Sequence, residues 1–168
     1  MKLMFLISLA VILLCCSYSF SQELGQQVQI EKMDISWKFE NDCITFTATA
    51  PDDGWVALGF NTENNIVGSN LIMSSVNGSK VNTGDFYVVS AGNPKPVVSL
   101  GSKSQIIKNS GFESEGTTTV TFSLPIAAFD NYHKNLKKGN KIWLIGAYSM
   151  EDEFDHHSRM RKHVEITL

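Results

Sequence analysis

The chain has 168 residues, of which 43% are hydrophobic and 18% charged, and its formal net charge is −3 at pH 7. This length is typical of one domain that buries its own core without disulfide bridges. The charge pattern lacks the basic patch that nucleic-acid binding requires, so we exclude nucleic acid as a partner.

The first 21 residues have the pattern of a secretory signal peptide. A short basic start precedes the apolar run LMFLISLAVILLCC, and the segment SYSFSQ then supplies small residues. Ser19 and Ser21 occupy the −3 and −1 positions of a cleavage site before Gln22. We therefore expect a signal peptide over residues 1–21 and a secreted mature domain over residues 22–168, either extracellular or periplasmic.

Other forms of membrane attachment are not expected. The apolar run is shorter than the roughly 20 residues of a transmembrane helix, and no second apolar run follows in the mature chain. Cys15 and Cys16 raise the question of lipid anchoring, but the residues before them are bulky where a lipobox has a small residue. After cleavage only Cys43 remains, which fits a buried apolar role and excludes a disulfide framework.

Short strand-like segments then follow one another along the chain. In MDISWKF the apolar residues Ile35, Trp37 and Phe39 alternate with polar ones, as in a strand with one buried face. CITFTATA alternates likewise, whereas GWVALGF is almost continuously apolar, which indicates a strand that is buried on both faces or lines a pocket. The further predicted strands are SNLIMSSV, DFYVVSA, PVVSL, SQIIKNSGF, TTTVTFSLPI, KIWLIGAYS and HVEITL.

Turn sequences separate these segments, and helical periodicity is absent. PDDG, NGSK, GNPKP, SEG and KKGN are all rich in turn-forming residues. Only AAFDNYHKNL could form a helical turn. About ten short strands with a turn every 8–12 residues or so predict an all-β protein, an antiparallel immunoglobulin-like β-sandwich.

Three segments in a fixed order resemble one family. They are DDGWVALGFNTENNIVGSNLIM (52–73), DFYVVSAGNPKPVVSLGS (85–102) and KIWLIGAYSMEDEFDHHSRMRKHVEITL (141–168). Together they resemble the DOMON family, β-sandwich domains named after dopamine β-monooxygenase, over about residues 30–168. The resemblance implies a secreted sandwich with a ligand between its sheets. In one branch, which includes the cytochrome domain of cellobiose dehydrogenase, that ligand is a b-type haem held by methionine and histidine.

The resemblance also implies positions for the two haem ligands. The family histidine lies in the loop before the last strand, near an arginine, and His157 matches it, with His156 as the reserve candidate. The family methionine follows the GF strand, where this chain has Ile66, whose alkyl group has no lone pair for iron. Met73 is a substitute candidate, displaced from Ile66 by roughly 20 Å of extended chain. Coordination of haem iron by His157 alone is a further possibility.

The histidines also have other interpretations. They could be exposed polar residues of an acidic loop, or part of a Zn or Cu site with nearby carboxylates, although no recognised ligand spacing is present. His133 is expected at the surface. Trp55 is expected in the core and is also a candidate wall of a ligand pocket.

A binding role is therefore favoured over catalysis. No GxSxG motif is present and Cys43 has no evident partner base, so we expect no enzyme. The leading hypothesis is a domain that binds b-type haem through His157 and transfers electrons to a redox partner protein. The alternative is a haem-free DOMON domain that binds a carbohydrate or a partner protein.

Overall fold

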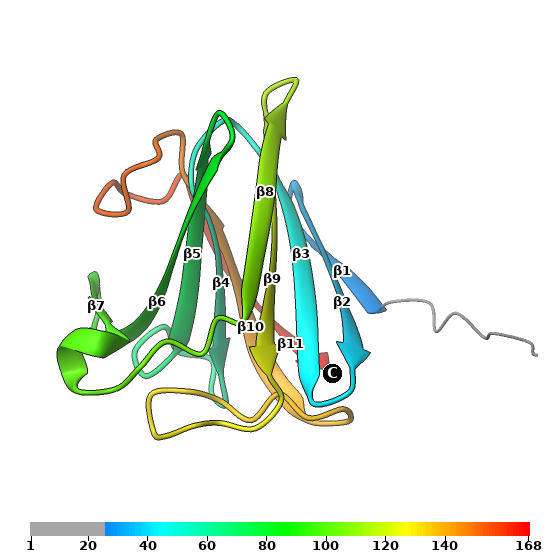
Figure 1. Ribbon diagram of the computed structural model, residues 1–168, viewed down its shortest axis with the longest axis vertical. Coiled ribbons are helices and arrows are strands. Elements are labelled where there is room, and N and C mark those ends of the chain that lie inside the picture. The colour runs from blue at the N-terminus through cyan, green and yellow to red at the C-terminus, as the bar shows by residue number, and fades with distance from the viewer. Residues whose placement is uncertain (1–25) are drawn as a thin grey trace, which may run out of the picture.

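Two antiparallel β-sheets pack face to face in the computed structural model, which describes residues 26–168 (Figure 1). One sheet has five strands in the order β1-β2-β3-β9-β8, and the other has six in the order β11-β10-β4-β5-β6-β7. The eleven strands confirm the predicted all-β sandwich. The predicted signal peptide lies outside the described residues.

Nine of the eleven strands overlap predicted segments, whereas β1 and β7 were not predicted, and β7 lies where the sequence GNPKP predicted a turn. The five-stranded sheet contains β1 (Gln26–Ile30), β2 (Met33–Glu40), β3 (Cys43–Pro51), β8 (Lys108–Ser114) and β9 (Thr117–Pro125). The six-stranded sheet contains β4 (Val56–Asn61), β5 (Asn70–Asn77), β6 (Lys80–Ser90), β7 (Asn93–Pro96), β10 (Lys141–Tyr148) and β11 (Met160–Thr167). Within residues 26–168, no helix is long and apolar enough to span a bilayer.

Two predicted elements take other forms. The segment PVVSL was predicted as a strand but forms the short 3₁₀ helix η1 (Val97–Leu100). Pro94 and Pro96 lack N–H donors, so the strand cannot continue its ladder past β7. Residues 127–136, predicted as a possible helical turn, form turns and bends without a helix.

Aromatic side chains fill the space between the two sheets. The ring of Phe46 lies 4.9 Å from that of Phe60 and 5.8 Å from that of Phe122, centroid to centroid. All three side chains are fully buried, so each sheet contributes to one continuous core. Around these three rings, protein side chains therefore fill the space between the two sheets.

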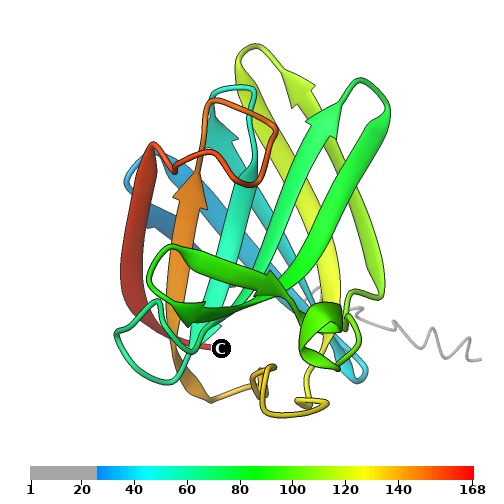
Figure 2. The ribbon, with the colours of Figure 1, turned by 90° about the vertical axis from the view of Figure 1, so that its left-hand side faces the viewer.

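Strand β4 is buried on both faces, as its apolar sequence predicted. Val56, Leu58 and Phe60 belong to the core between the sheets, whereas Ala57 belongs to a second apolar cluster on the outer face of the six-stranded sheet. Figure 2 shows that β7 and the loop between β10 and β11 fold across this outer face. A covered apolar surface thus exists outside the sandwich core.

Candidate functional site

A pocket of about 480 Å³ lies on the outer face of the six-stranded sheet. Its volume falls within the range of about 300–1,000 Å³ that small-molecule sites occupy. The resemblance implied a ligand between the two sheets. The pocket lies on the outer face instead, and core side chains fill the space between the sheets. Half of its 18 lining residues come from the second apolar cluster and the residues packed against that cluster.

The strand register builds the pocket floor from two rows of neighbouring residues. In one row Ala57 pairs with Ala147 on β10 and with Met73 on β5. In the next row Gly59 pairs with Ile145 and with Leu71. Because Ala57 and Ala147 are small, the floor is low where they pair, whereas the side chains of Ile145 and Leu71 lie over Gly59.

Aromatic side chains form one wall of the pocket. Phe86 of β6 meets Phe154 edge to face, with 5.9 Å between the ring centroids. Gly84, two residues earlier on β6, leaves space for the Phe86 ring, because a Cβ at Gly84 would overlap that ring. Trp55 also lines the pocket, and its indole N–H is buried without a hydrogen-bond partner among the described residues.

The loop of residues 149–159, here called the roof loop, covers the pocket from the side of β10 and β11. Backbone hydrogen bonds tie it to Trp55, the residue before β4, from Ser149 N–H to the Trp55 carbonyl (2.9 Å) and from Trp55 N–H to the Glu151 carbonyl (3.0 Å). At its other end Arg159 donates to both carboxylate oxygens of Asp52, each at 2.9 Å. The Ser149 hydroxyl also donates to the His157 carbonyl (3.1 Å) and so helps to place that residue.

Gly54 allows the roof loop to approach β4 so closely. A Cβ at Gly54 would lie 2.5 Å from the Ser149 carbonyl oxygen and 2.6 Å from the Glu151 nitrogen. We expect Gly54→Ala to displace the roof loop and to lower the free energy of unfolding by about 1–3 kcal/mol, since backbone atoms cannot rotate away. Urea denaturation and hydrogen exchange of residues 149–159 measure the two effects.

Gly84→Ala is the matched control for this change. Its Cβ would meet the far end of the Phe86 side chain, which can move without any backbone shift. We therefore expect a smaller loss of stability and a smaller change of exchange in the roof loop, confined to the residues around Phe154, which the Phe86 ring contacts. Equal effects of the two substitutions on the roof loop would contradict the role given to Gly54.

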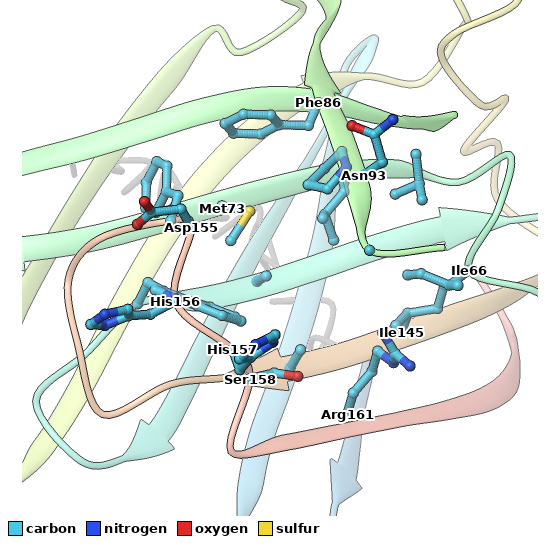
Figure 3. A pocket seen from close by; sticks show the side chains of 18 residues that line it. Ile66, Met73, Phe86, Asn93, Ile145, Asp155, His156, His157, Ser158 and Arg161 are labelled. Atoms are coloured by element: carbon cyan, nitrogen blue, oxygen red, sulfur yellow. The ribbon is translucent and has the colours of Figure 1, made fainter. Parts of the chain in front are cut away.

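His156 and His157 both lie in the roof loop, line the pocket and are exposed. Figure 3 shows the His157 ring among the lining side chains, whereas the His156 ring lies at the edge of the group. The His156 ring nitrogen, together with a carboxylate oxygen each from Glu151 and Glu153, forms an exposed group whose ligand atoms lie within 4.8 Å of one another. His157 is therefore the better placed of the two to reach a ligand in the pocket.

Ile66 and Met73 both line the pocket as well. The Asn61 side chain fixes the turn that carries Ile66 by donating to the carbonyls of Asn65 (2.6 Å) and Val67 (3.2 Å). Met73 was placed far from Ile66 by counting along an extended chain. It nevertheless reaches the same pocket, because β5 runs back antiparallel to β4 and the pocket extends along both strands.

Arg161 supplies a positive charge at the pocket. It pairs with Ala147 across the ladder between β10 and β11, so it extends the first floor row toward the edge of the sheet. Its side chain is exposed and forms no ion pair within residues 26–168. An anionic group on a ligand could therefore pair with it without displacing a protein carboxylate.

Sequence reasoning missed a buried polar cluster around His133. The prediction of a surface position was wrong, because His133 is only 4% exposed. Its Nδ1 lies 2.7 Å from Asp130 Oδ1 and its Nε2 lies 3.3 Å from Asp85 Oδ2. In the sequence, only the spacing of three residues between Asp130 and His133 could have indicated this cluster. Asp85, the other partner of His133, lies on a distant strand.

Comparison with known proteins shows one matching family and several similar folds. A family model described as the DOMON domain matches residues 29–149, a span that ends at the start of the roof loop. The MOXD1 homolog 2 of Drosophila melanogaster is 25% identical over 118 residues, which are 70% of this chain and 15% of that protein. The chain thus spans about 15% of the length of this curated relative.

Two solved structures share the fold at low sequence identity. The cytochrome b domain of pyranose dehydrogenase from Coprinopsis cinerea has a TM-score of 0.64 at 10% identity, covering 85% of this chain and 81% of its own. The cytochrome domain of Myriococcum thermophilum cellobiose dehydrogenase has a TM-score of 0.55 at 9% identity, covering 86% of this chain and 81% of its own. At such identities the likeness shows the fold.

Proposed function

The chain belongs to the DOMON domain family, and we propose that its outer-face pocket binds a b-type haem through His157 and serves electron transfer. One observation carries this proposal. His157 from the roof loop and Met73 from the floor line the same apolar pocket. Imidazole and thioether groups are the donor pair of the cytochromes that use a histidine and a methionine.

The residues of the pocket fit such a group in three respects. The small side chains of Ala57 and Ala147 leave a shallow apolar floor on which a flat ligand can lie. Phe86 and Phe154 supply an aromatic wall. Arg161 supplies a cation that can pair with the carboxylates of a haem, at the edge of the pocket where solvent is near.

Each residue has a defined task in this proposal. His157 would hold the iron through an imidazole lone pair, and Met73 would supply the sulfur lone pair that Ile66 cannot supply. The apolar floor keeps water away and so favours a stable reduced state, since burial is one of the factors that set haem potentials. The bound group would supply an iron that gains and loses a single electron.

The cellular setting is part of the proposal. The basic start, apolar run and small residues of the first 21 positions support secretion through a cleaved signal peptide. We propose a redox protein as the partner, because an electron-transfer module needs a donor and an acceptor. No catalytic role is assigned to the domain itself.

Met73→Leu tests the second ligand. The change keeps the volume of the floor, so it should cost less than about 1.5 kcal/mol of stability. We expect the optical spectrum with bound haemin to change from low spin to high spin and the reduction potential to fall, because the methionine sulfur raises it.

Met33→Leu is the matched control for Met73→Leu, since Met33 is fully buried in the core between the sheets. It should leave the spectrum and the potential unchanged. An unchanged spectrum in Met73→Leu would remove Met73 as a ligand and leave His157 alone.

A second candidate function has one observation in its favour. Ile66 occupies the position where the resemblance implies a methionine, and it packs against the apolar cluster of the pocket. A haem-free domain that uses the same pocket for a carbohydrate or for a segment of a partner protein would have no need of that methionine. Under this alternative, neither His157→Ala nor Met73→Leu would produce a spectral change with haemin.

A further inference from the structure

The cluster around His133 lies at the opposite end of the sandwich from the roof loop. Figure 1 shows the connection between β9 and β10, in yellow, at the lower end and the roof loop at the upper end. Residues 126–136, here called the latch segment, are closed at their base by a hydrogen bond from Leu136 N–H to the Ile126 carbonyl (2.8 Å). Within this segment, Asp130 and His133 are the residues that meet Asp85 of β6 and Ser102.

With both neighbouring carboxylates ionised, the geometry requires a protonated His133. A neutral imidazole has one N–H donor and one acceptor nitrogen, whereas an ionised carboxylate can only accept. Each ring nitrogen of His133 faces a carboxylate oxygen, from Asp130 at 2.7 Å and from Asp85 at 3.3 Å. Only the imidazolium ion can donate to both, so loss of the ring proton would set a nitrogen lone pair against a carboxylate.

The surroundings support the charged form. Burial alone would lower the pKa of His133, but the hydrogen bonds and negative charges of Asp85 and Asp130 together raise it above its usual value. Both the imidazole and the Asp85 side chain are almost fully buried, at 0% and 1% exposure. Two lysines of this region lie over aromatic rings, Lys103 over Phe129 (4.2 Å) and Lys134 over Tyr87 (5.6 Å).

Both carboxylates accept hydrogen bonds from other donors besides His133. Asp85 accepts from the Asn70 side chain (2.7 Å) and from Gln105 N–H (2.9 Å). Asp130 accepts from the Ser102 hydroxyl and from Tyr132 N–H (2.9 Å). Because these bonds persist, loss of the proton should leave the sandwich folded and should weaken the attachment of the latch segment to β6, which the His133–Asp85 contact provides.

The same cluster is connected to the wall of the pocket. Asp85 directly precedes Phe86 on β6, and the Asn70 side chain donates both to Asp85 and to the Phe86 carbonyl (3.1 Å). Tyr132 of the latch segment packs edge to face on Tyr87, the next residue of β6, at 5.1 Å between centroids. Movement of the latch segment would therefore act on the stretch of β6 that carries Phe86 and Val88 into the pocket.

We propose that His133 is a pH-sensitive latch: its protonated ring fastens residues 126–136 to β6, and loss of the proton releases this segment and loosens the pocket wall. The second effect, a change in ligand binding through the pocket wall, rests on the ligand-binding function proposed for the pocket. The latch itself does not depend on that function, because all of its parts lie outside the pocket.

Hydrogen exchange of the ligand-free protein at pH 6 and pH 9, corrected for intrinsic exchange rates, tests the latch. We expect protection in residues 127–135 to fall by about tenfold at the higher pH, the change that corresponds to loss of one hydrogen bond to a charged group. His133→Gln should show low protection at both pH values. Asp130→Asn, which keeps His133 but removes one charge, should move the transition to lower pH.

His163→Gln is the matched control. His163 lies on β11, and its ring bonds Asn64 Oδ1 at 2.9 Å and neither carboxylate of the latch. This variant should retain the response of the natural sequence. Equal protection at both pH values in the natural sequence, or an unchanged response in His133→Gln, would overturn the latch.

Haemin dissociation at the same two pH values tests the second effect, the change in ligand binding. Faster dissociation at pH 9 that disappears in His133→Gln is the expected result. If hydrogen exchange shows that the latch segment opens at pH 9 while the rate of haemin dissociation stays the same, the coupling between the latch and the pocket is overturned. Failure of the natural sequence to bind haemin at either pH would instead contradict the proposed function and leave the exchange result standing.

Discussion

Replacing His157 with alanine is expected to abolish specific haemin binding while leaving the sandwich folded. His157 is exposed and lines the pocket from a loop, so removal of its ring creates no core cavity. Outer-shell partners of metal ligands typically contribute about 10–100-fold in affinity, and loss of a ligand itself should cost at least as much. Titration of the variant with haemin, followed at the Soret band, measures the loss directly.

His156→Ala is the control for this experiment. The two histidines are adjacent in the roof loop, but the His156 ring nitrogen lies close to carboxylate oxygens of Glu151 and Glu153. We expect affinity close to that of the natural sequence. A larger loss in His156→Ala than in His157→Ala would reverse the assignment, and equal small losses in both would remove the roof loop as the source of the ligand.

Replacing His133 with alanine is expected to lower the free energy of unfolding by about 3–5 kcal/mol at pH 6, the usual cost of removing one partner of a buried charged pair. The change leaves the buried carboxylate of Asp85 without its cation. Urea denaturation at pH 6 measures the loss. His163→Ala serves as the comparison, because its ring is half-buried and bonds Asn64 outside the cluster.

The stabilising effect of His133 should also depend on pH in a defined direction. Its pKa is raised in the folded state, so its contribution is complete below about 6.5, the value in the unfolded chain, and is lost as pH rises through the folded pKa. Burial raises the pKa of Asp130, but the Ser102 and His133 hydrogen bonds lower it overall, so its contribution is lost as pH falls through the folded value.

The difference between the natural sequence and His133→Ala should therefore be largest between about pH 4 and pH 6.5 and shrink at higher pH. A difference that grows with rising pH would contradict the charged state assigned to His133.

The fold was predictable because alternation with a period of two is a local property of the sequence. Ile44, Phe46 and Ala48 on β3 alternate with threonines, and the structure buries these three residues as that pattern requires. The uninterrupted apolar sequence of β4 likewise indicated burial on both faces. In contrast, η1 was mistaken for a strand, since its apolar residues carry no information on whether a neighbouring strand is available to pair with them.

The position of the pocket could not be read from the chain because it depends on pairing between distant strands. Ala57 and Ala147 become neighbours only through the register of β4 with β10. Met73 enters the same floor only through the register of β4 with β5. The burial of His133 could not be predicted for the same reason. Its partner Asp85 lies on β6, and no residue near His133 in the sequence indicates that contact.

An optical titration of purified residues 22–168 with haemin, oxidised and then reduced, tests whether the outer-face pocket binds haem. We expect stoichiometric binding, with a shifted Soret band and sharp α and β bands on reduction, as for iron held by His157 and Met73. A spectrum indistinguishable from free haemin at stoichiometric protein concentration would contradict it and leave the pocket to a ligand without iron.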